Sequence, residues 1–293
     1  MQMTKVRQSE QEKAVINVLT YFDYFNYSPS FYQIHTFLPV KISKNDLKTQ
    51  VQAMVKSAKI LQGKLTYTGE GIYSLPDRKG YFTSRSKRYE ITQRKLKKIN
   101  RFVTYIKSMP WIDFIGVSGS CSTDNAGDLD DIDVFIISAP GGMWLARLSA
   151  VLTAKLLNMH RKRGARSVAD KVCLNLFFDG SSLAVPKQKR NLYTAHEVVQ
   201  IVPIHVRGGV YKRFMFENSW IQKYFPNVQI LKPLSVADST FTPIIKLLNS
   251  GAKQLQIDAI LSHRTTETIS DQQLWFFPDD FEKKIKKDIN IHP

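Results

Sequence analysis

The sequence predicts an α+β protein that begins with a helix-rich unit and continues into a small mixed sheet with flanking helices. Two observations support this fold class. Apolar residues recur at helical spacing between residues 10 and 58, whereas three short apolar runs after residue 110 have the length and composition of buried strands. The chain has 293 residues and a hydrophobic fraction of 43%, enough for two domains with cores. We expect four successive parts: residues 1–77, 78–106, 107–227 and 228–293.

Three helices are predicted at the start of the chain. Residues 10–24 place apolar side chains on one helical face, and residues 31–37 form a second, short helix after a Ser-Pro-Ser turn. Ser43 has the side chain of a helix N-cap, and it precedes a third amphipathic stretch over residues 44–58.

Short strands complete the first part. They are expected at residues 60–62, 64–68 and 71–75, and the dipeptide Gly69-Glu70 joins the last two as a hairpin. Three helices followed by a hairpin resemble a winged helix-turn-helix. The resemblance leaves two roles open, because such units contact nucleic acid in some proteins and serve as protein-docking modules in others.

A strongly basic segment separates the two predicted domains, and we expect it to form a linker helix over residues 78–106, amphipathic in its second half. Between residues 78 and 101 the only acid is Glu90. Two interpretations apply: a solvated linker helix, or a track for a phosphate backbone with Tyr81, Phe82 and Tyr89 available for stacking. The basic residues are Arg78, Lys79, Arg85, Lys87, Arg88, Arg94, Lys95, Lys97, Lys98 and Arg101.

The third part is predicted to alternate strands and helices. Strands are expected at residues 111–118, 133–138 and 172–178, with a short fourth at 183–185. Helices are expected at residues 142–158, at 194–200 with Thr194 as its cap, at 209–224 and, in the C-terminal helical segment, at 242–262.

The most informative motif lies where the first of these strands ends. A small-residue turn with Gly119 and Ser120 is followed, after ten residues, by Asp131-Ile132-Asp133 at the start of an apolar strand. Residues i and i+2 of a strand share a face, so both carboxylates should project together. Two like charges at short range need a cation, and hard carboxylate oxygens suit Mg²⁺. A Gly-Ser turn beside them lets backbone N–H groups approach a phosphate.

This arrangement resembles the signature of the polymerase β-like nucleotidyltransferase superfamily. The resemblance is strongest over residues 114–137 and implies that Asp131 and Asp133 hold Mg²⁺, with Mn²⁺ as the alternative. It also implies that Gly119 and Ser120 bind the phosphates of a nucleoside triphosphate.

The third carboxylate of that superfamily is expected on a neighbouring strand, where this chain has Asn175. An amide can bind a metal or nucleotide through its oxygen, but it adds no charge and cannot act as a base. A looser likeness joins the chain to winged-helix–nucleotidyltransferase proteins of small-genome bacteria and archaea, through residues 172–175, 191–197 and 218–220.

A general base is therefore sought elsewhere. His196 and Glu197 are candidates, although a helix N-terminal charge and a partly buried polar histidine are the favoured explanation of these two residues. Basic clusters that could meet a triphosphate or an acceptor nucleic acid lie at residues 161–166 and 263–264, and at Lys187, Lys189 and Arg190.

Composition narrows the partners and the compartment. The formal net charge of +17 favours polyanionic partners. Cys121 and Cys173 cannot form a disulfide framework and have no metal-binding spacing, so a reducing cytoplasm is expected. The apolar region at residues 134–157 is interrupted by a Pro-Gly-Gly turn, so no membrane span is expected.

Two functions follow from the sequence. The first is a Mg²⁺-dependent nucleotidyltransferase that transfers a nucleoside monophosphate to an acceptor hydroxyl and releases pyrophosphate. The alternative is a catalytically weak or inactive relative that acts as a DNA-binding regulator or an antitoxin-like protein. The acceptor, the base preference and the oligomeric state are left open.

Overall fold

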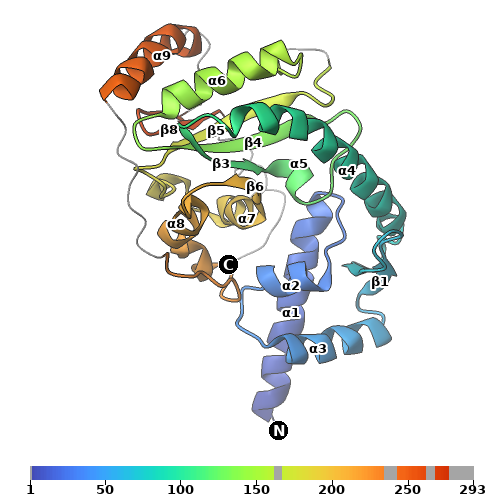
Figure 1. Ribbon diagram of the computed structural model, residues 1–293. Coiled ribbons are helices and arrows are strands. Elements are labelled where there is room, and N and C mark those ends of the chain that lie inside the picture. The colour runs from blue at the N-terminus through green and yellow to red at the C-terminus, as the bar shows by residue number, and fades with distance from the viewer. Residues whose placement is uncertain (1, 162–166, 234–242, 262–267, 277–293) are drawn as a thin grey trace.

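The computed structural model describes residues 2–161, 167–233, 243–261 and 268–276. The fold is α+β with a mixed six-stranded sheet, which confirms the predicted class (Figure 1). No helix in these ranges combines the length and the apolar character needed to cross a bilayer.

The N-terminal part contains three helices and a two-stranded hairpin. Ser30 and Ser43 cap the second and third helices through hydrogen bonds from the backbone N–H groups of Gln33 and Asp46. Ser30 also forms an isolated antiparallel bridge to Ile72 in the hairpin. The elements are α1 (Gln2–Tyr24), α2 (Phe31–Phe37), α3 (Lys44–Lys56), β1 (Leu61–Lys64) and β2 (Gly71–Ser74).

The hairpin differs from the prediction in one respect. β1 pairs directly with β2, and the predicted middle strand at residues 64–68 lies mainly in the connection. Leu65 closes this connection, because its N–H donates to the Glu70 carbonyl and its own carbonyl accepts from Gly69. Gly69 has φ of +67°, a backbone conformation that glycine adopts without steric cost.

The basic segment forms one long helix, α4 (Tyr81–Ile106), close to the predicted linker helix at residues 78–106. It runs from the hairpin to the sheet along the right side of the molecule in Figure 1. Its buried face carries apolar side chains that pack beside the sheet, together with the polar residues Arg85 and Lys95.

The sheet has the strand order β6–β3–β4–β5–β8–β7. β4 and β5 are parallel, whereas β3–β4, β3–β6, β5–β8 and β7–β8 are antiparallel. β7 and β8 lie in the predicted C-terminal segment, which therefore supplies strands as well as a helix. The strands are β3 (Ile112–Val117), β4 (Ile132–Ser138), β5 (Val172–Asp179), β6 (Val202–Val206), β7 (Thr268–Ile269) and β8 (Gln273–Trp275).

Two strand predictions need correction. Residues 183–185 are not a strand, because the buried side chain of Asn218 accepts from the Val185 N–H and donates to the Leu183 carbonyl in place of a neighbouring strand. Conversely, β6 was not predicted. Pro203 lies within it, and proline argues against a strand unless the strand is at an edge, as β6 is.

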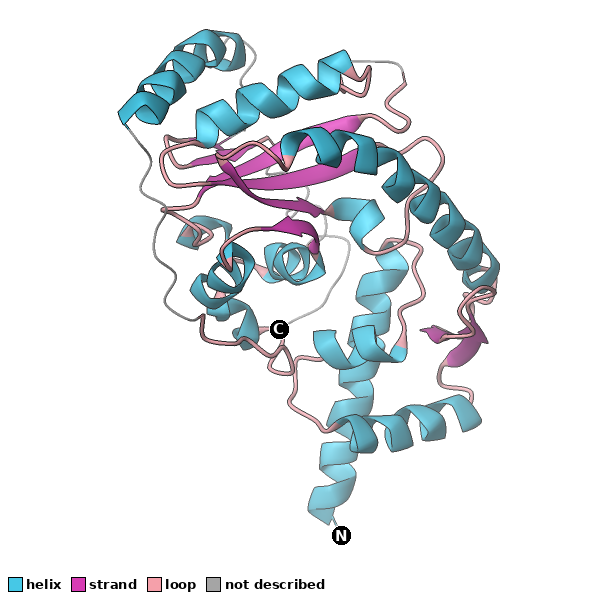
Figure 2. Ribbon diagram, in the orientation of Figure 1, coloured by secondary structure: helices cyan, strands magenta, loops and turns pink. Residues whose placement is uncertain are grey.

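Helices cover both faces of the sheet (Figure 2). α7 begins at Leu192, and its cap is Asn191, whose side chain accepts from the Thr194 N–H, so Thr194 is not the cap. The predicted helix at 209–224 is divided at Asn218 into α8 and a 3-10 helix, η2. The elements are α5 (Gly119–Ser122), α6 (Met143–Leu156), η1 (Lys187–Lys189), α7 (Leu192–Gln200), α8 (Val210–Glu217), η2 (Ser219–Lys223) and α9 (Pro243–Leu261).

Each face of the sheet has its own apolar core. On one face, alternate residues of β3 and β4 such as Ile115 and Val134 pack against α4, α6 and α9. On the other face, residues such as Phe135 pack against α7 and α8, and this second core continues without a break into α1, α2 and α3. The N-terminal helices thus share a core with the sheet.

Candidate metal and phosphate site at Asp131 and Asp133

The predicted carboxylates lie at one end of the central strand pair. β3 ends at Val117, which pairs with Val134, so the turn after β3 lies beside the start of β4. Asp131 immediately precedes β4 and Asp133 is its second residue. One carboxylate oxygen from each lies within 4.8 Å of the other, so the structure brings the two side chains together as predicted.

Gly119 brings the backbone of the turn against Asp133. Its φ is +61°, and a Cβ atom at this position would overlap with Oδ2 of Asp133. The small residue is therefore needed both for the backbone conformation and for the close approach. Ser120 follows in α5, and its hydroxyl donates to Asp130 at 3.1 Å. Of the predicted phosphate-binding groups, the Ser120 hydroxyl is thus already engaged within the protein.

Gly119→Ala should lower the free energy of unfolding by about 2 kcal/mol or more, from left-handed strain of about 1–2 kcal/mol plus the overlap with Asp133. Gly69→Ala is the matched control, because Gly69 has φ of +67° but has no atom within 4 Å of the added Cβ. Denaturant unfolding of both variants measures the difference. Equal losses would show that the contact with Asp133 is not close.

A third potential ligand is Cys173, which the sequence did not single out. In the parallel pairing of β4 with β5, Cys173 is the register partner of Asp133. Its sulfur and one oxygen each of Asp131 and Asp133 all lie within 4.8 Å of one another, an arrangement that could hold a metal ion. The available signal was its spacing from Asn175, since residues two apart on a strand share a face.

Asn175 supports Asp133. Its Nδ2 donates to Oδ1 of Asp133 at 2.6 Å, while its Oδ1 is buried and has no hydrogen-bond partner within the described ranges. The asparagine is 6% exposed. In this arrangement Asn175 orients the Asp133 carboxylate. The third donor atom of the group is the sulfur of Cys173.

Arg161 is the one described member of the basic cluster at residues 161–166, and it reaches this group. Its backbone N–H bonds to the Val172 carbonyl at the start of β5. Its Nη1 donates to Oδ2 of Asp131 at 2.6 Å and lies 3.1 Å from Sγ of Cys173. The guanidinium therefore offsets part of the negative charge that the two carboxylates concentrate.

The loop before Asp131 is held by α4. Lys95 is fully buried, and its Nζ donates to the carbonyls of Asp128 and Asp130 and to the carboxylate of Asp170. Asp130 in turn accepts from Ser120 and from the Gly127 N–H. These bonds fix the backbone that enters β4, so Lys95 and Asp130 position Asp131.

Other basic residues of α4 have similar structural roles. Arg85 is buried and donates to the Asp124 carbonyl and the Tyr27 hydroxyl, and Arg88 donates to Asn125. Further along the helix, Arg94 pairs with Asp128 and Lys98 pairs with Asp170. The predicted phosphate track is thus reduced, because half of its cations hold the loop at residues 124–130 or the Asp170 carboxylate.

The two candidate bases are consecutive residues of α7 with different contacts. His196 is stacked on Tyr21 at 3.7 Å between ring centroids and on Phe37 at 4.4 Å, in the core shared with the N-terminal helices. Burial lowers the pKa of His196 well below its ordinary value, so it stays neutral. This histidine packs against aromatic rings in the interior.

Glu197 remains a candidate. It accepts a hydrogen bond from Tyr193, and α7 packs against α5, which carries the Gly119 turn. Burial, and secondly the charge of Asp133, raises the pKa of Glu197 to about 7. A carboxyl group with a pKa near neutrality is suited to accept a proton from an acceptor hydroxyl.

Asp133 titrates in the same range. Burial, and secondly the charge of Asp131, raises the pKa of Asp133 to about 7. Between pH 4 and pH 7 the folded chain thus keeps a proton at Asp133 that the unfolded chain loses. The resulting stability is fully present below about pH 4 and is lost as the pH rises through 7.

Asp133→Asn should therefore gain stability over the unaltered protein as the pH rises from 5 to 8, by about 1–3 kcal/mol in the free energy of unfolding. Thermal unfolding in chelator at both pH values measures this gain. Glu197 titrates in both proteins, so only the difference between them reports on Asp133. Parallel pH profiles would contradict the raised pKa.

The remaining predicted basic residues lie elsewhere. Lys189 lies over the ring of Trp275, and Arg190 donates to the Val185 carbonyl and lies over Trp220. With Lys187 they follow the far end of β5, opposite the end that carries Cys173. The structure therefore does not bring them to Asp131. The cluster at residues 263–264 lies outside the described ranges.

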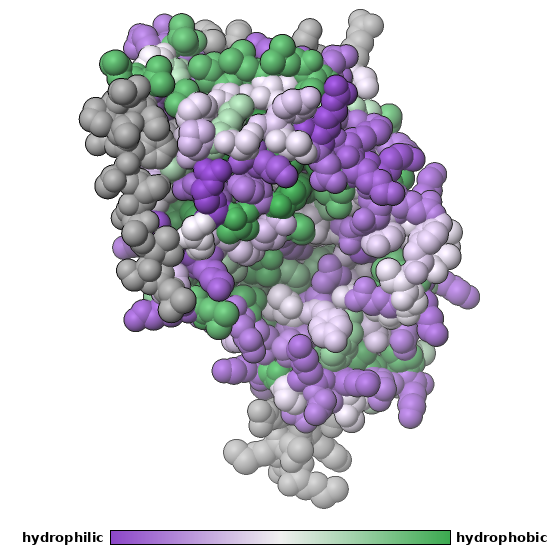
Figure 3. All heavy atoms as spheres, viewed as in Figure 1, coloured by the Kyte–Doolittle hydropathy of each residue, from purple (hydrophilic) through white to green (hydrophobic). Residues whose placement is uncertain are grey.

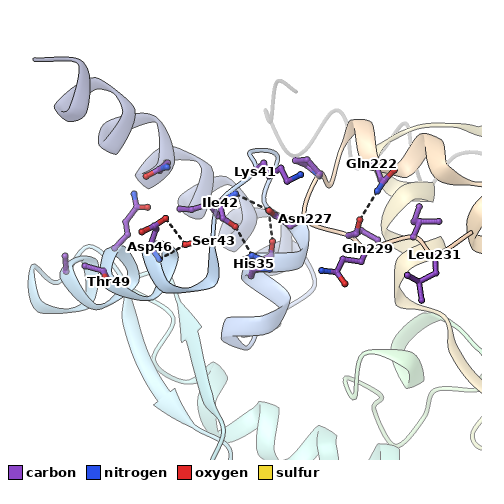
Figure 4. A pocket seen from close by; sticks show the side chains of 16 residues that line it. His35, Lys41, Ile42, Ser43, Asp46, Thr49, Gln222, Asn227, Gln229 and Leu231 are labelled. Atoms are coloured by element: carbon purple, nitrogen blue, oxygen red, sulfur yellow. Dashed lines mark hydrogen bonds between the residues drawn. The ribbon is translucent and has the colours of Figure 1, made fainter.

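A groove of 1110 Å³ lies on another part of the molecule, between α3 and the segment after η2 (Figure 4). Asn227 joins its two walls, because its side chain accepts from the Ile42 N–H and donates to the carbonyls of His35 and Val40. None of the predicted site residues lines this groove.

Comparison of the chain with protein-family models, with curated proteins and with solved structures finds no match.

Proposed function

We propose that this protein is a metal-dependent nucleotidyltransferase. One observation carries the proposal: Asp131, Asp133 and Cys173 present three donor atoms within 4.8 Å of one another, directly beside a glycine turn whose backbone contacts Asp133. Carboxylates that can hold a divalent cation next to a glycine turn suit phosphoryl transfer, where catalysis is mainly positioning and charge stabilisation.

In the proposed reaction the acceptor hydroxyl oxygen forms a bond to the α-phosphorus of a nucleoside triphosphate. The bond from that phosphorus to the β-phosphate bridging oxygen breaks, and pyrophosphate leaves. Asp131 and Asp133 would hold a divalent cation, which when bound would supply charge stabilisation, and Asn175 and Arg161 orient these two carboxylates. Glu197 takes the acceptor proton.

Contacts within the protein hold the Asp133 carboxylate in a fixed orientation, as expected of a metal ligand. Asp133 is placed by a hydrogen bond from Asn175 on one side and by the Gly119 backbone on the other. Such second-layer contacts are typical of carboxylates that bind metals, because they fix the direction of the oxygen lone pairs.

Release of pyrophosphate from labelled nucleoside triphosphates tests the proposal, with Mg²⁺ or Mn²⁺ and a panel of acceptors that includes DNA, RNA, tRNA, protein and small hydroxyl compounds. Metal-dependent pyrophosphate release that a chelator abolishes is expected. Triphosphate turnover that continues in chelator would contradict a metal-dependent transfer.

A DNA-binding regulator or antitoxin-like protein is the second candidate function. Asn175 in place of a third carboxylate favours this second function, because a neutral amide binds a metal ion less strongly than a charged carboxylate does. The N-terminal order of three helices and a hairpin also favours it, through its resemblance to a winged helix. Triphosphate binding that depends on Asp131, without pyrophosphate release on any acceptor, would support this function over transfer.

Nucleic acid is the proposed macromolecular partner in either case. Lys87, Lys97 and Arg101 are exposed, and with Arg94 they follow one side of α4 (residues i, i+7, i+10 and i+14). Figure 3 shows hydrophilic side chains gathered on the side of the molecule along which α4 runs. Lys48 and Gln52 are exposed on α3.

Lys87→Ala/Lys97→Ala/Arg101→Ala should weaken duplex DNA binding at all sequences and reduce the slope of log affinity against log salt by about 0.9 for each phosphate that the protein no longer neutralises. Fluorescence anisotropy over a salt series measures both effects. Arg85 and Arg88 are excluded from this variant because they hold the loop at residues 124–130. Lys48→Ala/Gln52→Ala is the comparison, since it should change sequence preference if α3 enters the major groove. An unchanged slope in the triple variant would leave α4 without a role in binding.

A further inference from the structure

The donor set at the candidate site is mixed, and its third atom is sulfur. Cys173 lies opposite Asp133 in the β4–β5 register, and its Sγ lies within 4.8 Å of one oxygen each of Asp131 and Asp133. We propose that these three residues bind a thiophilic divalent cation of the Zn²⁺ class, and that Mg²⁺ arrives separately with the phosphates of the nucleotide. The first part stands on the donor set alone, whereas the second part rests on the proposed function.

Ligand chemistry separates the two kinds of cation. Mg²⁺ prefers hard oxygen donors, keeps several waters and usually binds through one or two carboxylates together with substrate phosphates. Cysteine sulfur instead selects softer cations, and Zn²⁺ accepts thiolate and carboxylate together. Two carboxylates and one thiol therefore suit a Zn²⁺-class ion better than Mg²⁺.

The state of the thiol sharpens this preference. A cation can use this sulfur only by displacing its proton, which an ion with high thiolate affinity does and Mg²⁺ does not. Nη1 of Arg161, 3.1 Å from Sγ, would stabilise the thiolate that results.

Neighbouring side chains orient the donors through hydrogen bonds. Asn175, 6% exposed, donates to Asp133 and has a buried Oδ1 without a partner in the described part of the chain. Asp131 is oriented by Arg161. Three protein donors leave the fourth position of a tetrahedral zinc site open, as catalytic sites do and purely structural sites do not.

The chain contains a matched control for the sulfur. Cys121 is the other free cysteine, it is buried, and its Sγ lies 3.9 Å from the Asp131 carbonyl oxygen without belonging to the group of three. Cys121→Ser and Cys173→Ser make the same chemical change a short distance apart, so only coordination by Cys173 distinguishes them.

The experiment titrates the full-length protein, freed of metal by chelation, with Co²⁺ and Cd²⁺ and follows sulfur-to-metal charge-transfer absorption. We expect this band in the unaltered protein and in Cys121→Ser. Cys173→Ser should lack the band and bind Cd²⁺ at least roughly 10- to 100-fold more weakly, the loss that even outer-layer substitutions cause. Excess Mg²⁺ should not displace Cd²⁺, whereas Cys173→Asp should lose the band and gain affinity for Mn²⁺. Circular dichroism confirms that each variant is folded.

The outcomes separate this inference from the proposed function. Absence of the band in the unaltered protein, or its persistence in folded Cys173→Ser, would overturn the thiophilic site while leaving metal-dependent transfer to be judged by pyrophosphate release. A band that depends on Cys173, in a protein that releases no pyrophosphate with Mg²⁺ and any acceptor, would support the metal site and overturn the transferase.

Discussion

Asp133→Asn should reduce nucleotide transfer by about a thousandfold, because loss of a charged metal ligand costs about 4 kcal/mol of transition-state stabilisation. Asp131→Asn should have a similar effect, and the double variant should lose little more, since the two residues hold one ion together. Metal-dependent pyrophosphate release under single-turnover conditions is the measurement.

Asp128→Asn is the matched control for these variants. Asp128 belongs to the same loop, but its side chain is exposed, pairs with Arg94 and is not a member of the group of three donors. It should retain nearly full activity. Asp131 and Asp133 variants that are folded and as active as Asp128→Asn would show that the pair does not take part in catalysis.

Lys95→Met should lower the free energy of unfolding by about 3 kcal/mol, because it removes a buried ammonium group and leaves the three acceptors of that group without this charged donor. Three oxygens lose a bond, two of them backbone carbonyls of the loop before Asp131. Methionine has similar length, so the change removes charge and hydrogen bonds with little loss of volume. For a chain of this size we expect the melting temperature to fall by about 5–10 °C.

Lys97→Met is the control on the same helix, since Lys97 is exposed and its replacement should change stability by less than about 0.5 kcal/mol. Differential scanning calorimetry measures the melting temperatures of both variants. Melting temperatures that agree would mean that the buried lysine contributes no more than an exposed one. A fall in transfer activity greater than the loss of folded protein is also expected, because the loop positions Asp131.

Local patterns accounted for much of the fold. The second and third helices, the strands that flank the Gly119 turn and α6 lie close to their predicted limits, because their apolar spacing is set by the same core contacts that the structure shows. The first helix ends at Tyr24 as predicted, but it begins at Gln2 rather than at residue 10. The hairpin connection and the cap of α7 were misplaced by a few residues. Their positions depend on single hydrogen bonds, from Leu65 to Glu70 and from Thr194 to Asn191, that composition does not reveal.

Contacts between distant segments explain the remaining differences. The region at residues 183–185 needs no strand partner because Asn218, more than thirty residues later, bonds its backbone. Cys173 joins Asp133 only through the parallel register of β4 and β5, which spacing along the chain cannot fix. Likewise, the basic residues of α4 do not form one continuous surface. Some are exposed, whereas Arg85 and Lys95 are buried and hold neighbouring segments in place.

The stacking of His196 on Tyr21 and Phe37 also limits which parts of the protein can be exchanged. His196 of α7 is enclosed by Tyr21 of α1 and Phe37 of α2, and the core around it runs unbroken to the strands. The N-terminal helices are therefore not an exchangeable module, since removing them would uncover an apolar face of the sheet-bearing half. A substitution on either side of this contact changes the packing of both halves, so a redesign of one half has to include the facing residues of the other.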